Sequence, residues 1–162
     1  MSNLTLRILS ALVLAPLVLL CLHAGGLYTQ ILLTVVTAAA MWEWGCMFLP
    51  KDVTTRIFVV VLTSLCAFVL MGTQSFLLGF LCVFWTFMLL FLSFLLPVGP
   101  KWEGFDSIAR AAFGLFYVVI PIASFAWLRA KGDVDFPQSG GDWVYLGLLC
   151  TWVDDSFAYF AG

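Results

Sequence analysis

Residues 76–96 read FLLGFLCVFWTFMLLFLSFLL and contain no charged side chain. A helix that crosses a bilayer needs about 20 predominantly apolar residues, so this stretch predicts a transmembrane span. Residues 97–100 (PVGP) end it. The stretch lacks the alternation of apolar and polar residues that is typical of membrane barrel strands. It therefore favours an α-helical span.

The rest of the chain has a similar composition. Of the 162 residues, 64% are hydrophobic and 10% are charged, and the mean hydropathy is +1.11. Ordinary soluble domains have about 45–50% apolar and about 25% charged residues, so the composition excludes that class. It also excludes disorder, because disordered chains are polar and highly charged. The net charge of −2 and the lack of a basic run predict no nucleic-acid partner.

Five further apolar stretches accompany the first, and they predict an all-α integral membrane protein with about six transmembrane helices. We expect residues 1–162 to form a single polytopic membrane domain. The predicted spans are approximately 4–22, 27–44, 57–71, 76–96, 111–128 and 143–162. The span at residues 4–22 also resembles a signal peptide. The rest of the chain is membrane-like, however, and contains no secreted domain to export.

Basic residues near the span ends predict the orientation. With the N-terminus in the cytoplasm, five basic residues fall on the cytoplasmic side and two on the opposite side. The five are Arg7, Lys51, Arg56, Lys101 and Arg110, and the two are Arg129 and Lys131. This distribution follows the positive-inside rule, so we expect a cytoplasmic N-terminus.

The most informative feature is a pair of adjacent acids, Asp154 and Asp155, inside the last predicted span. Burying a carboxylate at the bilayer centre costs at least about 2.5–3.5 kcal/mol on insertion scales. If the span ended before Asp154, the pair would be only an interfacial end, but the segment would then be about half a normal span. Intramembrane acids are functional by default, so we interpret the pair as a site.

Helical geometry gives the two acids different positions. If the span enters at Trp143, Asp155 lies about 18 Å into a core of about 30 Å, which is past the midplane toward the cytoplasm. Adjacent residues point about 100° apart, so the two acids are not equivalent. Mg²⁺ prefers one or two carboxylates together with substrate phosphates. Asp154 and Asp155 are therefore our candidate metal ligands.

Other polar residues are weaker candidates. Glu43 lies between two tryptophans and is expected at an interfacial span end, and His23 is expected to be structural. The five cysteines lie in or beside apolar segments without a CxxC pair, so we interpret them as small hydrophobic side chains rather than metal ligands or disulfides. They are Cys21, Cys46, Cys66, Cys82 and Cys150.

Residues 101–112 are expected to lie at the cytoplasmic interface before the fifth span. Helical periodicity puts Trp102, Phe105, Ile108 or Ala109, and Ala112 on one side of this stretch. Its charged residues are Lys101, Glu103, Asp106 and Arg110. Such a set is most often a solvated helix face. The alternative, binding of an anionic head group at the membrane surface, remains open here.

Four segments in chain order resemble one known family. Residues 152–162 (WVDDSFAYFAG) resemble the W-x-x-D-[ST]-G-A-Y-x-x-G segment of the integral-membrane phosphatidate cytidylyltransferases. Residues 7–18 (RILSALVLAPLV) resemble their R-I-x-[ST]-A-[LI]-x-[LIV]-x-P-L-V opening. Residues 42–44 (WEW) resemble their W-E-[WY], and residues 114–118 (GLFYV) resemble their G-x-x-Y-[VI]. The likeness covers the whole chain, and residues 152–162 are its most specific part.

The resemblance implies an enzyme of phospholipid biosynthesis that transfers CMP from CTP to phosphatidic acid, giving CDP-diacylglycerol and pyrophosphate. It implies that Asp155 is the catalytic acid of a cation-dependent polar cavity and binds Mg²⁺, with Asp154 assisting in both roles. Ser156 and Tyr159 would be cofactor-binding neighbours. The resemblance leaves open whether a second cation binds. The family has a small or neutral residue at Asp154 and glycine at Phe157, so this chain departs from it at both positions.

Family members are longer and carry further basic and acidic signatures. We therefore expect this chain to be the N-terminal part of such an enzyme, incomplete at its C-terminus and inactive alone. The expected partners are CTP, phosphatidic acid and membrane lipids, and a homodimer is allowed. The expected location is the bacterial inner membrane, with the site facing the cytoplasm. Two alternatives stay open: a cation- or proton-coupled transporter fragment, with the acids as its ion site, and a related CTP-dependent lipid kinase.

Overall fold

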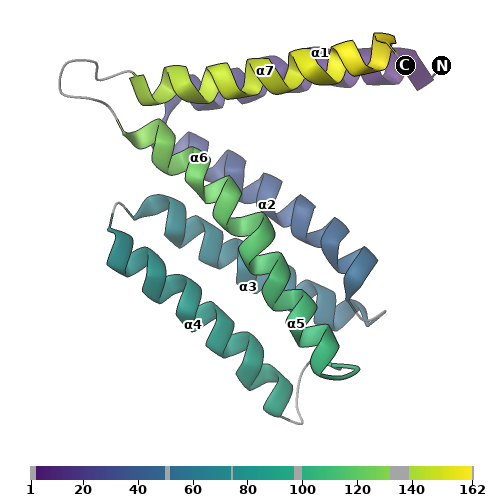
Figure 1. The fold of residues 1–162 in the computed structure, drawn as a ribbon, viewed down its shortest axis with the longest axis vertical. Coiled ribbons are helices and arrows are strands. Elements are labelled where there is room, and N and C mark those ends of the chain that lie inside the picture. The colour runs from purple at the N-terminus through teal and green to yellow at the C-terminus, as the bar shows by residue number, and fades with distance from the viewer. Residues whose placement is uncertain (1–2, 50–51, 74, 97–99, 132–138, 162) are drawn as a thin grey trace. The chain divides into compact units, whose positions relative to one another are not determined.

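The structure is a computed structural model that describes residues 3–49, 52–73, 75–96, 100–131 and 139–161. The side chains of residues 3–11, 139 and 159–161 are outside this description. Every regular element in the described ranges is a helix, which confirms the all-α prediction there (Figure 1). The helices are α1 (Asn3–Ala24), α2 (Gly26–Phe48), α3 (Val53–Gly72), α4 (Phe76–Leu95), α5 (Phe105–Gly114), the π-helical turn η1 (Leu115–Val119), α6 (Ile120–Ala130) and α7 (Ser139–Ala161).

Four helical runs are long and apolar enough to cross a membrane. They are Gly26–Phe48, Val53–Gly72, Phe76–Leu95 and the continuous run Phe105–Ala130. They overlap the second to fifth predicted spans. Together they indicate a membrane protein, because each exceeds or approaches the length that a bilayer crossing requires.

The first and sixth predicted spans have a different outcome. α1 and α7 form at the expected places, but neither belongs to these four runs within the described residues. The described apolar part of α1 is Leu12–Ala24, which is shorter than a span. α7 carries Asp142, Asp154 and Asp155, which lower its hydropathy. Four of the six predicted spans are therefore indicated within the described residues, and a crossing by α1 or α7 stays a prediction.

The chain divides into two compact units. Unit 1 comprises Met1–Thr29 and Trp127–Gly162, and therefore contains α1 and α7. Unit 2 comprises Gln30–Ala126, and therefore contains α3, α4, α5 and η1. α2 and α6 each continue from one unit into the other.

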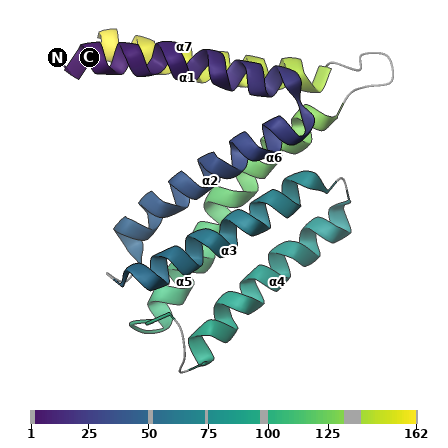
Figure 2. The same ribbon diagram turned by 180° about the vertical axis from the view of Figure 1, so that it is seen from behind.

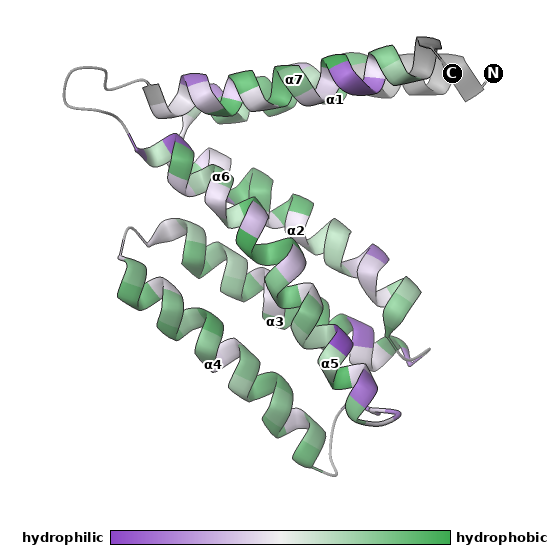
Figure 3. Ribbon diagram, in the orientation of Figure 1, coloured by the Kyte–Doolittle hydropathy of each residue, from purple (hydrophilic) through white to green (hydrophobic). Residues whose placement is uncertain are grey.

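In unit 2, α3 and α4 form an antiparallel hairpin, as their short connection predicts, and both views show them side by side (Figure 1, Figure 2). The buried residues of α4 are Gly79, Thr86, Leu90 and Ser93. Those of α3 include Thr63, Cys66 and Ala67. The two helices pack against each other, with Cys66 next to Cys82, and we call this contact the α3–α4 seam. Small side chains at such a seam let membrane helices approach closely. The residues of α4 are hydrophobic along almost the whole helix (Figure 3).

The N-terminus of α3 is fixed by a small polar network. Asp52 caps the helix, and its Oδ2 accepts hydrogen bonds from the Thr55 N–H at 2.9 Å and the Thr55 hydroxyl at 2.8 Å. The Thr55 hydroxyl oxygen also accepts a hydrogen bond from the N–H of Lys101 at 2.8 Å. Thr55 is fully buried. One threonine therefore joins the start of α3 to the connection between α4 and α5.

Replacing Thr55 by valine is expected to lower the free energy of unfolding by about 1–3 kcal/mol. Valine keeps the volume of the side chain but removes the hydroxyl. The N–H of Lys101 and the Asp52 carboxylate then each lose a hydrogen-bond partner. Unfolding in detergent micelles measures the change. Thr54→Val is the matched control, because Thr54 is exposed, and it should change stability by less than about 0.5 kcal/mol. Equal losses in both variants would contradict this role for Thr55.

The cap at α3 also predicts a dependence on pH. The N–H of Thr55, and then its hydroxyl, hold the pKa of Asp52 below its ordinary value of 3.8. A lowered folded-state pKa stabilises the folded protein above the unfolded pKa, and this contribution disappears as the pH falls through the folded-state value. We expect the unfolding temperature to decrease below about pH 4. Asp52→Asn keeps an oxygen acceptor but does not titrate, so its decrease should be smaller, and identical pH profiles would refute the assignment.

The fifth predicted span begins earlier than expected. The helical run starts at Phe105, not at residue 111, so part of the stretch that was expected at the interface belongs to the same continuous helical run. The residues predicted to share one helical side differ in burial, because Ile108 is buried and Phe105 is exposed. Phe105 is 65% exposed, and the buried residues of α5 are Ser107, Ile108, Ala111 and Gly114. The run stays continuous through η1 and Pro121, which agrees with the expectation that this span tolerates its proline.

In unit 1, Arg129 caps the C-terminal end of α1. Its Nε donates to the carbonyl of Leu22 at 3.0 Å, and its Nη2 donates to the carbonyl of His23 at 3.3 Å. A cation at a helix C-terminus satisfies free carbonyls and interacts favourably with the helix dipole. Gly25, which follows α1, has φ +68° and lies close to the same guanidinium, so a side chain there would be both strained and crowded.

Candidate functional site

The predicted acidic pair lies within α7, which continues as one helix from Ser139 to Ala161. The helix therefore continues past the acidic pair, and the inclusion of Asp154 and Asp155 in a membrane span stays a prediction. Asp154, Asp155 and Ser156 are all exposed on unit 1. They form a hydrophilic interruption in a helix that is otherwise largely apolar (Figure 3). The side chain of Tyr159 lies outside the described residues.

The hydroxyl of Ser156 is already engaged within the helix. It donates to the carbonyl of Trp152 at 2.7 Å, one turn earlier. The hydroxyl proton is therefore occupied, and the lone pairs of the oxygen remain for a ligand. Ser156 is consequently better suited to accept from an amino or hydroxyl group, or to bind a cation, than to donate to a phosphate.

The donor set on α7 fits a magnesium ion that also contacts substrate. Within the part of the chain that the structure describes, no group of three or more His, Cys, Asp or Glu side chains could hold a metal. Two adjacent carboxylates remain, and Mg²⁺ uses one or two carboxylates with substrate phosphates and water completing its shell. The chemistry of Asp154 and Asp155 thus fits the predicted cofactor, provided that the substrate supplies further oxygen ligands.

A second polar region lies at one end of unit 2. Lys101 contacts Thr55, the Arg56 side chain lies against Gly45 and Cys46, and Arg110 contacts Phe48. Hydrophilic residues gather at this end in the hydropathy view (Figure 3). The prediction that Arg56, Lys101 and Arg110 share one side is therefore confirmed for unit 2. The membrane side that this end faces stays a prediction.

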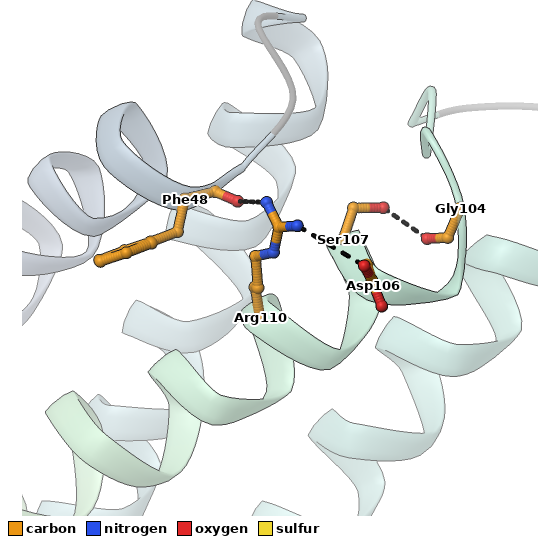
Figure 4. A network of polar contacts seen from close by, with 5 residues as sticks. All are labelled: Phe48, Gly104, Asp106, Ser107 and Arg110. Carbon is orange, nitrogen blue, oxygen red and sulfur yellow. Dashed lines mark hydrogen bonds and ion pairs between the residues drawn. The ribbon is translucent and has the colours of Figure 1, made fainter.

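Arg110 organises this polar end (Figure 4). Its Nη1 donates to the carbonyl of Phe48 at 3.3 Å, and its Nη2 lies 3.7 Å from Oδ2 of Asp106. Ser107 donates to the carbonyl of Gly104 at 2.6 Å. A cavity of about 250 Å³ opens here. Its lining residues are Met47, Phe48, Leu49, Glu103, Gly104, Asp106, Ser107 and Arg110.

The charges that line this cavity favour the interpretation of residues 101–112 as a solvated helix face. They disfavour the alternative, in which these residues bind an anionic head group. Two acids, Glu103 and Asp106, line it with one base, Arg110, so its lining does not attract an anion. The side chains of Arg110 and Asp106 are 53% and 88% exposed, and an exposed ion pair stabilises little. The bond from Arg110 to Phe48 instead satisfies a free carbonyl at the C-terminal end of α2.

Two of the segments that carry the family resemblance meet in unit 2. Trp44, from residues 42–44, donates its indole N–H to the carbonyl of Arg110 at 3.1 Å. Its ring centroid lies 5.8 Å from that of Tyr117, in residues 114–118. A Cβ atom added at Gly114 would lie 2.7 Å from the indole nitrogen. The glycine is therefore needed for the tryptophan to pack, while the neighbouring Glu43 is exposed. Both segments have a packing role here.

Unit 1 also has an apolar hollow of about 450 Å³. Its lining residues are Pro16, Leu19, Leu20, His23 and Tyr145. His23 is exposed and gives its backbone carbonyl, not its ring, to the Arg129 contact. The structural interpretation of His23 remains a prediction, because no described contact assigns a task to its imidazole.

The apolar helices indicate a helical membrane protein that carries two exposed acids on one helix, a combination that is known from membrane enzymes and ion carriers. Residues 5–162 match the cytidylyltransferase family. The chain therefore belongs to the cytidylyltransferase family, which identifies it as a nucleotidyltransferase that uses CTP. No curated protein and no solved structure matches the chain.

Proposed function

We propose that the protein transfers CMP from CTP to phosphatidic acid in the bilayer, giving CDP-diacylglycerol and pyrophosphate for phospholipid biosynthesis. The observation that carries the proposal is the placement of Asp154 and Asp155 within the continuous helix α7 of a cytidylyltransferase. The four apolar runs, which comprise helices α2 to α6, expose large hydrophobic side chains to their surroundings. This exposure supports a lipid as the acceptor of CMP.

The reaction brings two anions together. A phosphate oxygen of phosphatidic acid attacks the α-phosphorus of CTP, and the bond from that phosphorus to the bridging oxygen breaks, so that pyrophosphate leaves. Asp155, assisted by Asp154, would hold the cation, and Ser156 and Tyr159 would contact the nucleotide. The lone pairs of Ser156 suit a ribose hydroxyl or a cytosine amino group. Mg²⁺, when bound, neutralises the phosphates and stabilises the charge that develops during transfer.

The proposed setting follows the distribution of basic residues. The site would face the cytoplasm of a bacterial inner membrane, so that CTP enters from water and phosphatidic acid from the lipid. Membrane lipids would cover the exposed apolar helices, and a homodimer is compatible with this arrangement. A second cation would need oxygen ligands beyond the two acids, which substrate phosphates supply.

The test is a product assay on the full-length protein in lipid nanodiscs that contain phosphatidic acid, with CTP and Mg²⁺. We expect CDP-diacylglycerol and an equal amount of pyrophosphate, and we expect both to be lost with EDTA. CDP together with a newly phosphorylated lipid would instead show a lipid kinase. Cation or proton flux in liposomes that does not depend on CTP would show a transporter. Either result would replace the proposal.

A further inference from the structure

Two cysteine side chains face each other in the α3–α4 seam. The Sγ atoms of Cys66 and Cys82 lie 3.6 Å apart, and Sγ of Cys82 also lies 3.7 Å from the carbonyl oxygen of Cys66. Cys66 is 3% exposed and Cys82 is half-buried. The sequence indicates that each cysteine is a small hydrophobic residue and does not predict this pair. The two positions come together only when the hairpin folds.

The pair lies away from the water at either end of the hairpin. Cys66 precedes the last residue of α3 by six positions, and Cys82 follows the first residue of α4 by six positions. At 1.5 Å per residue, both lie about 9 Å inside the helix ends. Both helices belong to the four runs that can cross a membrane. A reagent that reaches these thiols must therefore dissolve in the bilayer.

The geometry is close to that of a disulfide. The S–S bond length is about 2.05 Å, so the two sulfur atoms need to approach by about 1.5 Å. Ala67 is adjacent to Cys66 and Gly79 lies about one turn from Cys82, and both are buried in the seam. Neither residue has a bulky side chain that would hold the helices apart during this approach.

We propose that Cys66 and Cys82, which the hairpin juxtaposes inside the membrane, form a dithiol site that a lipid hydroperoxide oxidises to a disulfide. One thiol sulfur attacks the terminal peroxide oxygen, the O–O bond breaks and the thiol proton passes to the leaving alkoxide oxygen, which gives a cysteine sulfenic acid and a lipid alcohol. The second thiol attacks the oxidised sulfur, the S–O bond breaks and water leaves. The peroxide gains two electrons and the thiols lose two, so one disulfide, one lipid alcohol and one water result.

The disulfide would tie α3 covalently to α4. The modification does not involve α7, so it is independent of the proposed transferase reaction. Its readout is sulfur chemistry rather than CTP turnover, so its failure is distinguishable from failure of the proposed transferase function.

The first experiment treats the full chain in lipid nanodiscs with cumene hydroperoxide, an apolar hydroperoxide probe. We expect an intact-mass loss of two hydrogens and a cross-linked peptide that joins Cys66 to Cys82. Cys66→Ala and Cys82→Ala should each abolish the cross-link, whereas the control Cys21→Ala should retain it. Absence of the cross-link in the wild-type chain, or cross-links formed only by Cys46 or Cys150, would overturn the proposal.

A second experiment needs no substitution in the seam. In a variant with Cys21, Cys46 and Cys150 replaced by serine, phenylarsine oxide should bind one arsenic per chain, because trivalent arsenic bridges two close thiols. Bound arsenic should protect both remaining cysteines from N-ethylmaleimide. Alkylation of both cysteines despite saturating arsenical would show that the two thiols do not act as a pair.

Discussion

Replacing Gly114 by leucine is expected to destabilise unit 2 strongly. The Cβ alone would lie 2.7 Å and 2.9 Å from Nε1 and Cδ1 of Trp44, and 3.2 Å from Cε of Met41. Overpacking of this kind costs about 1–3 kcal/mol. Displacement of the indole would also break its bond to the carbonyl of Arg110, which contributes about 1 kcal/mol more. Unfolding in mixed micelles, followed by the change in tryptophan fluorescence, measures the loss.

Gly147 provides the matched control for this substitution. It lies within helix α7 and is exposed, and a Cβ added there meets nothing within 4 Å. Gly147→Leu should therefore be close to neutral or slightly stabilising, because leucine has the higher helix propensity. Adding Trp44→Phe to Gly114→Leu should recover part of the loss, since the smaller ring makes room. Strict additivity of the two substitutions would show that the glycine and the indole do not interact.

Asp155→Asn is expected to reduce the rate of CMP transfer by a factor on the order of 10²–10³, the effect of removing one preorganised electrostatic contact. Asparagine keeps the shape of the side chain but removes the charge that would hold the cation. Steady-state transfer, measured over a range of Mg²⁺ concentrations, should show a weaker response to the metal. Because Asp155 is exposed on a continuous helix, its replacement should leave the unfolding temperature nearly unchanged.

Two further aspartates on α7 serve as comparisons. Asp142 is exposed in the first turn of the same helix, so Asp142→Asn should keep near-normal transfer. Asp154→Asn should have a smaller effect than Asp155→Asn, since Asp154 departs from the pattern that the family resemblance provides. Near-normal turnover of Asp155→Asn would remove this residue from the proposed site. Equal losses at Asp142 and Asp155 would point to a general charge effect instead.

The helices were predictable wherever apolar composition alone determines them. The predicted span 76–96 and the observed helix Phe76–Leu95 nearly coincide, because uncharged residues extend to both ends. Helix starts that contain polar residues were placed too late. α3 begins at Val53 rather than residue 57, since hydropathy ignores a threonine-rich first turn that Asp52 caps. The capping pattern was present in the sequence and marks this start correctly.

The candidate site was only partly predictable. The sequence placed Asp154 and Asp155 correctly inside a helix, because a helix of normal length must include them. It could not identify Arg129 as the cap of α1. That contact joins the carbonyl of Leu22 to a guanidinium 107 positions later in the chain, and the basic residue was interpreted only through its charge. Contacts of this kind depend on packing between helices, which periodicity within a helix does not encode.

The π-helical turn Leu115–Val119 constrains how this protein can change in length. Ala111, Leu115, Val119 and Ala123 are all buried and follow one another at intervals of four residues. In a regular helix of 3.6 residues per turn, such a series would drift around the axis, and the wider π turn keeps it on one face. Deleting one residue from this turn would restore a regular helix and rotate everything after it. Insertions and deletions among relatives should therefore avoid residues 115–119 and accumulate in the connections between helices.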